Sequence, residues 1–199
     1  MTQSIRHIVV FAAMAALTAC GSRTLTSEVT RFHELPPIQG QTVAIVAKDA
    51  GKAGSIEFGA YADQVAQELS RHGFRPAGEA PPELIAQIDY SQRPVGTDER
   101  DSGSRVGIGI GGGSGGRSHV GIGLGTSFAV GSGKRRAAQR TFIVEIDDRQ
   151  TGKRVFEGRA QSVGAAENFA SALPYMISAL FDGFPGNSGE TVTVKRTVE

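Results

Sequence analysis

Thirteen glycines lie between Gly103 and Gly133, and this density restricts the fold more than any other feature of the sequence. Each glycine costs a helix about 1 kcal/mol relative to alanine, so no helix is expected through this stretch. Two copies of one pattern stand inside it, VGIGIG at 106–111 and VGIGLG at 120–125, and each alternates a β-forming residue with glycine. The alternation predicts two extended arms or one long hairpin, inserted at 103–133 between two core strands with a flexible turn in the middle.

The glycine spacing also fits a dinucleotide-binding fingerprint, for example at Gly107, Gly109 and Gly112. Such a fingerprint needs a strand before it and a helix after it, because the helix N-terminus binds the pyrophosphate. The glycines that follow exclude that helix. A Walker motif fails as well, since Phe128 replaces its first glycine and Arg135 stands where Ser or Thr would bind magnesium. We therefore expect neither a phosphate loop nor a nucleotide cofactor.

The clearest helix is predicted within residues 55–74. Its apolar residues recur at three- and four-residue spacing and form one stripe: Phe58, Tyr61, Ala62, Val65, Ala66 and Leu69. Ser55 is expected to cap the N-terminus, and Gly73 is expected to end the helix in a left-handed conformation with Phe74 folding back on the last turn.

A second helix is predicted near the C-terminus. Its apolar stripe consists of Leu173, Met176, Ile177, Leu180 and Phe181. Pro174 is tolerated only in a first helical turn, which places the N-cap at Ser171, with a looser start near Glu167 as the alternative. Gly183 and Pro185 then end the helix.

Alternating apolar and polar residues predict the strands. They cover 27–35, 41–49, 84–92, 139–148, 154–163 and 190–198, and Thr151-Gly152 predicts a hairpin turn between the fourth and fifth. Phe142, Val144 and Ile146 are expected on one face. Since two helices cannot cover both faces of a broad sheet, we predict an α+β two-layer sandwich, with both helices on one face of a mixed or antiparallel sheet. The whole of 27–199 is expected to form a single domain.

The N-terminus carries an export signal. Ile8–Leu17 is an apolar run with the length of a signal-peptide core, and it is too short to span a bilayer. The following Leu17-Thr18-Ala19-Cys20 resembles the lipobox of bacterial lipoproteins, in which the cysteine receives the lipid after cleavage. This predicts a cleaved signal at 1–19, a lipidated tether at 20–26 and membrane attachment through Cys20. Because Gly21 is not the Asp of the inner-membrane retention signal, the resemblance implies the periplasmic face of the outer membrane.

Charge is balanced overall but concentrated around the glycines. Without Arg6, which leaves with the signal, 20 Lys and Arg face 20 Asp and Glu, so no bulk field for nucleic acid is expected. The region from Arg100 to Arg140 is strongly basic. Its candidate contacts to an anionic partner are Arg117, Lys134, Arg135, Arg136 and Arg140. These side chains either meet anionic lipid or an acidic surface, or simply keep a solvated loop soluble.

Catalytic and metal-binding patterns are scarce. His33, His72 and His119 stand in separate contexts without metal-ligand spacing, and lipidation would consume the only cysteine. Asp147 and Asp148 precede a turn, where carboxylates commonly cap backbone groups. The sequence therefore predicts no enzyme, no metal and no cofactor.

Taken in order, the segments VTRFHELP, PPELIAQIDY, VEIDDRQTGKRVFEGRA and ALPYMISALFDGFPG, together with the lipobox and the glycine-rich middle, resemble a family of small bacterial lipoproteins. That family is defined by the domain of unknown function 4136, and it often has Trp at the place of Phe156. The resemblance implies no catalytic residues. Our interpretation is a non-enzymatic, lipid-anchored module that binds an envelope protein, lipid or cell-wall polymer. Two alternatives stay open: a periplasmic hydrolase or ligand carrier, and a purely structural envelope component.

Overall fold

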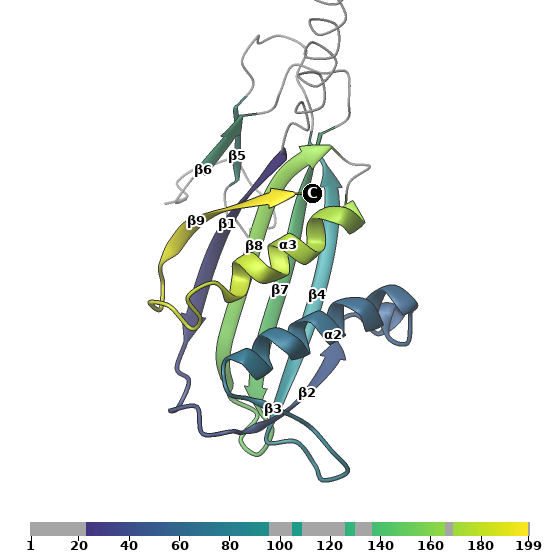
Figure 1. Ribbon diagram of the computed structural model, residues 1–199, viewed down its shortest axis with the longest axis vertical. Helices are drawn as coiled ribbons and strands as arrows, with labels where there is room; N and C mark the ends of the chain where they lie inside the picture. Colours follow the sequence, from purple (N-terminus) through teal and green to yellow (C-terminus); the bar gives the residue numbers. More distant parts are fainter. Residues whose placement is uncertain (1–22, 96–104, 109–125, 130–136, 166–168, 199) are drawn as a thin grey trace, which may run out of the picture.

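The computed structural model describes residues 23–95, 105–108, 126–129, 137–165 and 169–198 (Figure 1). In chain order its elements are β1 (Arg23–His33), β2 (Thr42–Ala47), a 3-10 turn (Ala50–Lys52), α2 (Ile56–Arg71), β3 (Arg75–Pro76), β4 (Leu84–Pro94), β5 (Arg105–Ile108), β6 (Thr126–Ala129), β7 (Ala137–Asp148), β8 (Arg154–Ala165), α3 (Phe169–Phe181) and β9 (Thr191–Val198). Among these residues, no helix is both long and apolar enough to cross a membrane.

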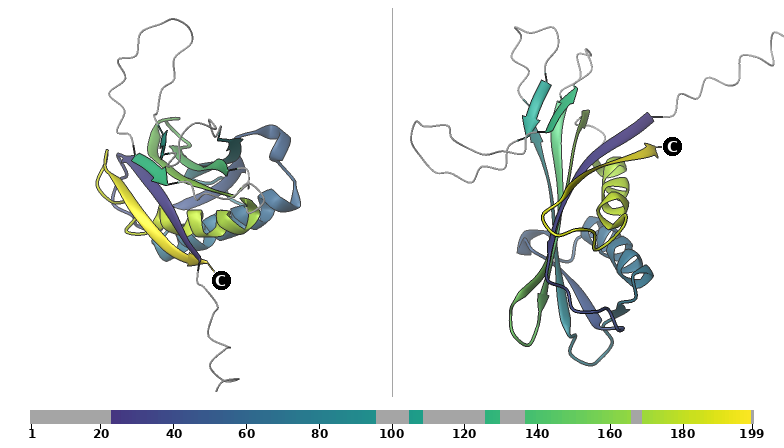
Figure 2. Two further views of the ribbon diagram at one scale, coloured as in Figure 1. Left: turned by 90° about the horizontal axis from the view of Figure 1, so that it is seen from above. Right: turned by 90° about the vertical axis from the view of Figure 1, so that its left-hand side faces the viewer.

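Seven strands form one mixed sheet in the order β3-β2-β4-β7-β8-β1-β9. β2 runs parallel to β3 and β4, and every other neighbouring pair is antiparallel. Both helices pack against the same face of the sheet (Figure 2). The predicted α+β class, with two layers and both helices on one face, is therefore confirmed.

The core lies between the helices and the face of the sheet that they cover. Side chains of a strand alternate between its two faces, so every second residue of the central strands is buried. Phe142, Val144 and Ile146 of β7 are fully buried, which confirms the face predicted for them. At the end of β7 the Asp148 carboxylate accepts a hydrogen bond of 2.7 Å from the Thr151 amide, and Gly152 has a φ of 68°, as the predicted turn requires.

Helix α2 begins and ends where its local sequence predicts. The Ser55 hydroxyl accepts a hydrogen bond from the Phe58 amide at 3.0 Å. At the other end Gly73 has a φ of 92°, and the Phe74 amide donates to the Leu69 carbonyl at 3.1 Å. Tyr61, Val65 and Leu69 of the predicted stripe are buried against the sheet.

Helix α3 begins before the first of its two predicted starts. Ser171 is not the N-cap, because Phe169 is already helical and Pro174 lies inside the helix, which agrees with the alternative start near Glu167. Proline lacks the N–H that would bond to the carbonyl four residues earlier. The helix tolerates this loss because its apolar residues are buried on the sheet: Ala172, Leu173, Met176, Ile177, Ala179, Leu180 and Phe181.

The expected tether and the glycine-rich insert also differ from the prediction. β1 starts at Arg23, so residues 23–26 of the expected tether are paired with β9, from Arg23 opposite Val198 to Thr26 opposite Lys195. In the insert, β5 covers the beginning of the first glycine repeat, but its antiparallel partner is β6 rather than the second repeat. Residues 109–125, which hold that second repeat, lie outside the described part of the chain.

Candidate binding groove at the edge of the sheet

β2 is an edge strand over most of its length. On one side β4 pairs with all of Val43–Ala47, whereas on the other side β3 pairs only with Thr42 and Val43. In Figure 1, β3 stops beside the start of β2, and no other described strand continues along that side. The outer edge of β2 beyond Val43 is therefore open within the described residues.

The backbone groups that face this open edge follow from the alternation of a strand. The Lys48 amide donates to the Ile88 carbonyl of β4 at 3.0 Å, whereas the Val43 carbonyl accepts from the Ala77 amide on the opposite side at 3.0 Å. Even-numbered residues thus bond to β4, and odd-numbered residues face outward. Ile45 and Ala47 consequently point their N–H and C=O groups at the open edge.

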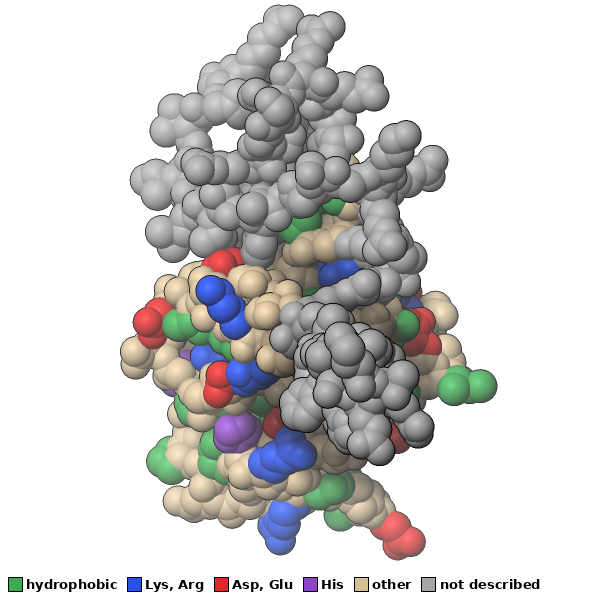
Figure 3. Space-filling model, turned by 45° about the horizontal axis from the view of Figure 1, so that its top comes forward, with side chains coloured by type: hydrophobic (Ala, Val, Ile, Leu, Met, Phe, Trp, Pro, Cys, Tyr) green, Lys and Arg blue, Asp and Glu red, His purple; other side chains and the backbone are tan. Residues whose placement is uncertain are grey.

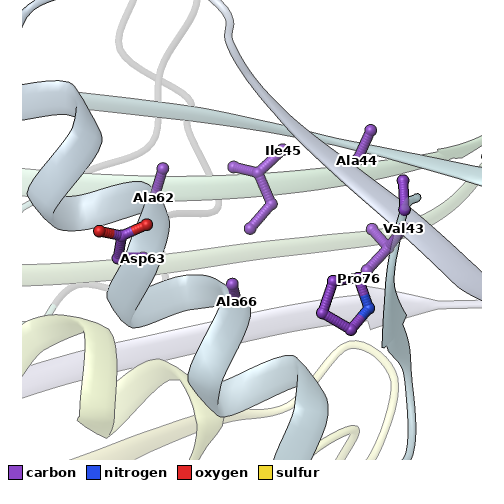
Figure 4. Close-up of a pocket in the computed structure, with 8 residues that line it drawn as sticks. Val43, Ala44, Ile45, Ala62, Asp63, Ala66 and Pro76 are labelled. Carbon is purple, nitrogen blue, oxygen red and sulfur yellow. The ribbon is translucent and has the colours of Figure 1, made fainter. Parts of the chain in front are cut away.

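A groove of about 350 Å³ lies between this edge and helix α2. Its described lining consists of Val43, Ala44, Ile45, Ala62, Asp63, Ala66, Pro76 and Ala77 (Figure 4). Figure 4 shows Ala66 and Pro76 toward the Val43 end and Ala62 and Asp63 toward the Ile45 end. Alanines one helical turn apart leave space along the strand edge that larger side chains would fill.

Asp63 is the one charged side chain among the eight lining residues. It is exposed, and no hydrogen bond or ion pair joins it to another described residue. The lysines that follow β2 are held elsewhere, since Lys48 Nζ is 2.5 Å from Glu145 Oε1 and Lys52 Nζ bonds to an Asp89 carboxylate oxygen. The groove is therefore apolar with one negative charge at one end.

The opposite edge of the sheet, β9, has a different character. Its middle carries two basic residues, Lys195 and Arg196, of which Lys195 is exposed. Charged residues, and Lys above all, protect edge strands from pairing with other chains. The β2 sequence TVAIVA has no charge and no proline, and its pairing with β4 runs from Val43 to Ala47 without a bulge. Of the two edges, β2 is thus the one without protection.

The structure describes one of the nine site residues predicted from the sequence. Leu17, Thr18, Ala19 and Cys20, and the basic residues Arg117, Lys134, Arg135 and Arg136, lie outside the described residues. Arg140 is 3% exposed and shares the core-facing side of β7 with Phe142. It therefore does not belong to an exposed basic surface, because its parity on the strand turns it inward. In the face seen in Figure 3, basic and acidic side chains are interspersed over the described surface.

The described histidines and the carboxylates before the β7–β8 turn form structural contacts. His33 Nε2 lies 3.1 Å from the Gly186 carbonyl oxygen, and His72 Nε2 lies 3.2 Å from that of Phe181. Asp147 pairs with Arg154 at 2.8 Å. Asp148 caps the turn, and its hydrogen bonds with Thr151 lower the pKa of its carboxyl group. Within the described residues no three His, Cys, Asp or Glu side chains gather as metal ligands would.

The sequence predicts β2 and α2 but does not reveal the groove between them. Its lining comes from segments up to 34 residues apart, Val43 to Ala77, and no local pattern reveals that one strand edge stays open. The sequence nevertheless holds one sign of this groove: an uncharged strand is followed by a helix with alanine at two positions one turn apart, Ala62 and Ala66.

Comparison with known proteins places the fold but not the activity. Residues 32–186 match a family model described as "Domain of unknown function (DUF4136)". No curated protein matches the sequence. A PDZ domain protein from Parabacteroides distasonis is similar in structure, with a TM-score of 0.54 and 12% identity, over 92% of this chain and 41% of that one. The chain thus spans about two fifths of that protein, and the likeness shows the fold alone. The PelC dodecamer from Paraburkholderia phytofirmans matches with a TM-score of 0.37 and 13% identity, over 79% of this chain and 93% of that one.

Proposed function

We propose that this chain, which belongs to the DUF4136 family of domains of unknown function, is a non-enzymatic, lipid-anchored binding module at the periplasmic face of the outer membrane. Its ligand is an extended segment of a partner polypeptide, which adds to the sheet as a strand beside β2. The observation that carries this proposal is the open edge at Ile45 and Ala47 next to an apolar groove.

Strand addition suits the groups that the edge offers. Ile45 and Ala47 present two N–H donors and two C=O acceptors, and residues two apart in a strand are separated by about 6.6 Å. An extended peptide matches that repeat with its own backbone, so main-chain hydrogen bonds supply affinity whatever its sequence. Side chains on the helix-facing side of the peptide would enter the groove and supply selectivity.

The alternatives receive less support from the groove. A hydrolase or a carrier of small ligands needs several polar groups that converge in a pocket, and the lining offers one carboxylate, Asp63. A purely structural component would pair one edge with an edge of another copy, but Lys195 and Arg196 protect β9 against such pairing. Pairing of β2 with β2 of a second copy is the remaining self-association, and it would appear as a dimer in solution.

The proposed anchor would leave the groove accessible. The three-residue step from Cys20 to Arg23 can span at most about 10 Å, so a lipid on Cys20 would hold the start of β1 close to the membrane. In Figure 1, β1 starts at the end of the sheet opposite β2. The groove would then lie at the membrane-distal end, where a partner in the periplasm can reach it.

Membrane fractionation tests the anchor. We expect Cys20→Ala to appear as an unprocessed or soluble form, because an amide-linked or thioether-linked lipid can no longer be added. Ser22→Ala, two residues away, is the matched control and should pellet with membranes like the unchanged chain. Pelleting of Cys20→Ala at the unchanged level would exclude lipid anchoring through this residue.

Site-specific photocrosslinking in intact cells tests the groove. A photoreactive phenylalanine analogue at Ala62 should capture a partner protein, and mass spectrometry should identify a crosslinked extended segment. The same analogue at Ile56, which is 94% exposed and lies outside the groove, is the control. Ala47→Pro, which removes an outward N–H, should abolish the Ala62 crosslink. A crosslink that persists in Ala47→Pro, or that joins two copies of this chain, would contradict the proposal.

A further inference from the structure

The two ends of the groove differ: one is apolar, and the other carries the Asp63 carboxylate. This difference predicts which side chains a bound segment should have. Resting on the function proposed above, we propose that the bound segment carries a Lys or Arg side chain opposite Asp63 and a small or apolar side chain two residues away, opposite Ala66.

The geometry of strand addition places these two side chains. A strand added beside β2 directs alternate residues to the face on which α2 lies. Val43 and Ile45 already point to that face, because they pack with the core. Helix-facing residues of the added strand therefore enter the space between β2 and α2, and consecutive ones lie about 6.6 Å apart. They lie beside Ile45 and Ala47, because Pro76 of β3 already occupies the position beside Val43, so the residue beside Ile45 is the one nearer Ala66.

The two ends of the groove differ in what they accept. At the Val43 end the walls are Ala66 and Pro76, as Figure 4 shows, and Ala77, whose amide donates to the Val43 carbonyl; these walls favour a small apolar side chain. At the Ile45 end Asp63 stands beside Ala62, one helical turn before Ala66. Since no described residue pairs with Asp63, its charge is available to a ligand, and an opposite charge is the natural complement.

The order of the two side chains reports the direction of the bound strand. In a segment that runs parallel to β2, the apolar residue comes first and the basic residue follows two positions later. In an antiparallel segment the order is reversed. One sequence pattern thus gives both the charge preference and the orientation.

Selection from a library of random octapeptides displayed on phage, against the full chain in detergent micelles, tests the inference. We expect enrichment of peptides with an apolar and a basic residue at spacing two. Synthetic versions should lose about two- to fivefold in affinity for Asp63→Asn, the range of an exposed ion pair. Asp63→Lys should weaken them further. Thr193→Lys is the matched control, because it adds the same net charge as Asp63→Asn at an exposed residue of β9, on the opposite edge of the sheet, and it should leave affinity unchanged.

The outcomes separate this inference from the proposed function. Peptides that lack a basic position and bind Asp63→Lys normally, but are lost in Ala47→Pro, overturn the charge preference and leave strand addition standing. Enriched peptides that bind Ala47→Pro as well as the unchanged chain overturn both, and so does a selection that enriches no sequence.

Discussion

The Nε atom of Arg31 lies 2.8 Å from the carbonyl oxygen of Leu180, so a strand residue caps the C-terminal end of helix α3. Its Nη2 atom also reaches the carbonyls of Ala179 at 3.3 Å and Asp182 at 2.6 Å. The last carbonyls of a helix have no partner within the helix, and a cation there also complements the helix dipole. Burial lowers the pKa of this guanidinium, and the charges of Asp182 and Glu190 oppose that effect.

Replacing Arg31 should therefore destabilise the fold strongly. For Arg31→Met we expect the free energy of unfolding in urea to fall by about 2 to 4 kcal/mol, because buried carbonyls lose their charged donor. Arg196→Met is the matched control. It breaks the 3.0 Å contact of Arg196 with Asp182 at the surface, where an ion pair contributes at most about 1 kcal/mol. Equal losses in the two variants would contradict a capping role for Arg31.

Replacing Gly158 and Gly59 with alanine should change the stability of the fold in opposite directions. A Cβ at Gly158 of β8 would stand 2.8 Å from the Phe156 ring and 3.1 Å from Leu180, whereas one at Gly59 of α2 would meet nothing within 4 Å. Gly158→Ala should cost about 1 to 3 kcal/mol through overpacking, and Gly59→Ala should gain up to about 1 kcal/mol through helix propensity. Thermal unfolding of both variants measures this, and a stabilised Gly158→Ala would show that the core yields there.

Stability should decline in strongly alkaline solution through Tyr61. Burial, together with the hydrogen bond to Glu57, raises the pKa of the Tyr61 hydroxyl from 10.0 to about 12. As pH rises past 10, the unfolded chain loses this proton before the folded chain does, so stability falls between about pH 10 and about pH 12. Urea titrations across this range should show a shallower decline for Tyr61→Phe than for the control Tyr175→Phe. Part of the slope should remain, because burial also raises the pKa of Tyr90.

Elements whose signals are local could be predicted from the sequence. Helix α2 follows from an apolar stripe bounded by Ser55 and Gly73, and each of these acts on backbone groups within a few residues of itself. Local signals left the start of α3 undecided between Ser171 and a position near Glu167. The helix is present from Phe169, because burial of its apolar residues on the sheet, which depends on distant strands, outweighs the preference of Pro174 for a first turn.

The candidate site depends even more on distant pairing. Nothing local to β2 shows that β3 covers only Thr42 and Val43, and this shortfall is what opens the edge. Arg140 is a different case, because its position could have been predicted. The local charge pattern predicted an exposed basic contact, but Arg140 alternates in step with Phe142, Val144 and Ile146, so it lies on the core-facing side of β7.

Proline substitutions at neighbouring positions of β2 test the open edge without any partner. The Val46 N–H faces β4, so Val46→Pro should break a ladder hydrogen bond and cost about 3 kcal/mol in the free energy of unfolding. The Ala47 N–H faces outward, so Ala47→Pro should cost less than about 1 kcal/mol, as expected for proline on an edge strand with its nitrogen toward solvent. Thr197→Pro, on the other edge strand β9, is the control: it measures how much a proline costs in the free energy of unfolding at an edge strand. If Ala47→Pro destabilises the chain as much as Val46→Pro, the outer edge of β2 is already paired and the groove cannot accept a strand.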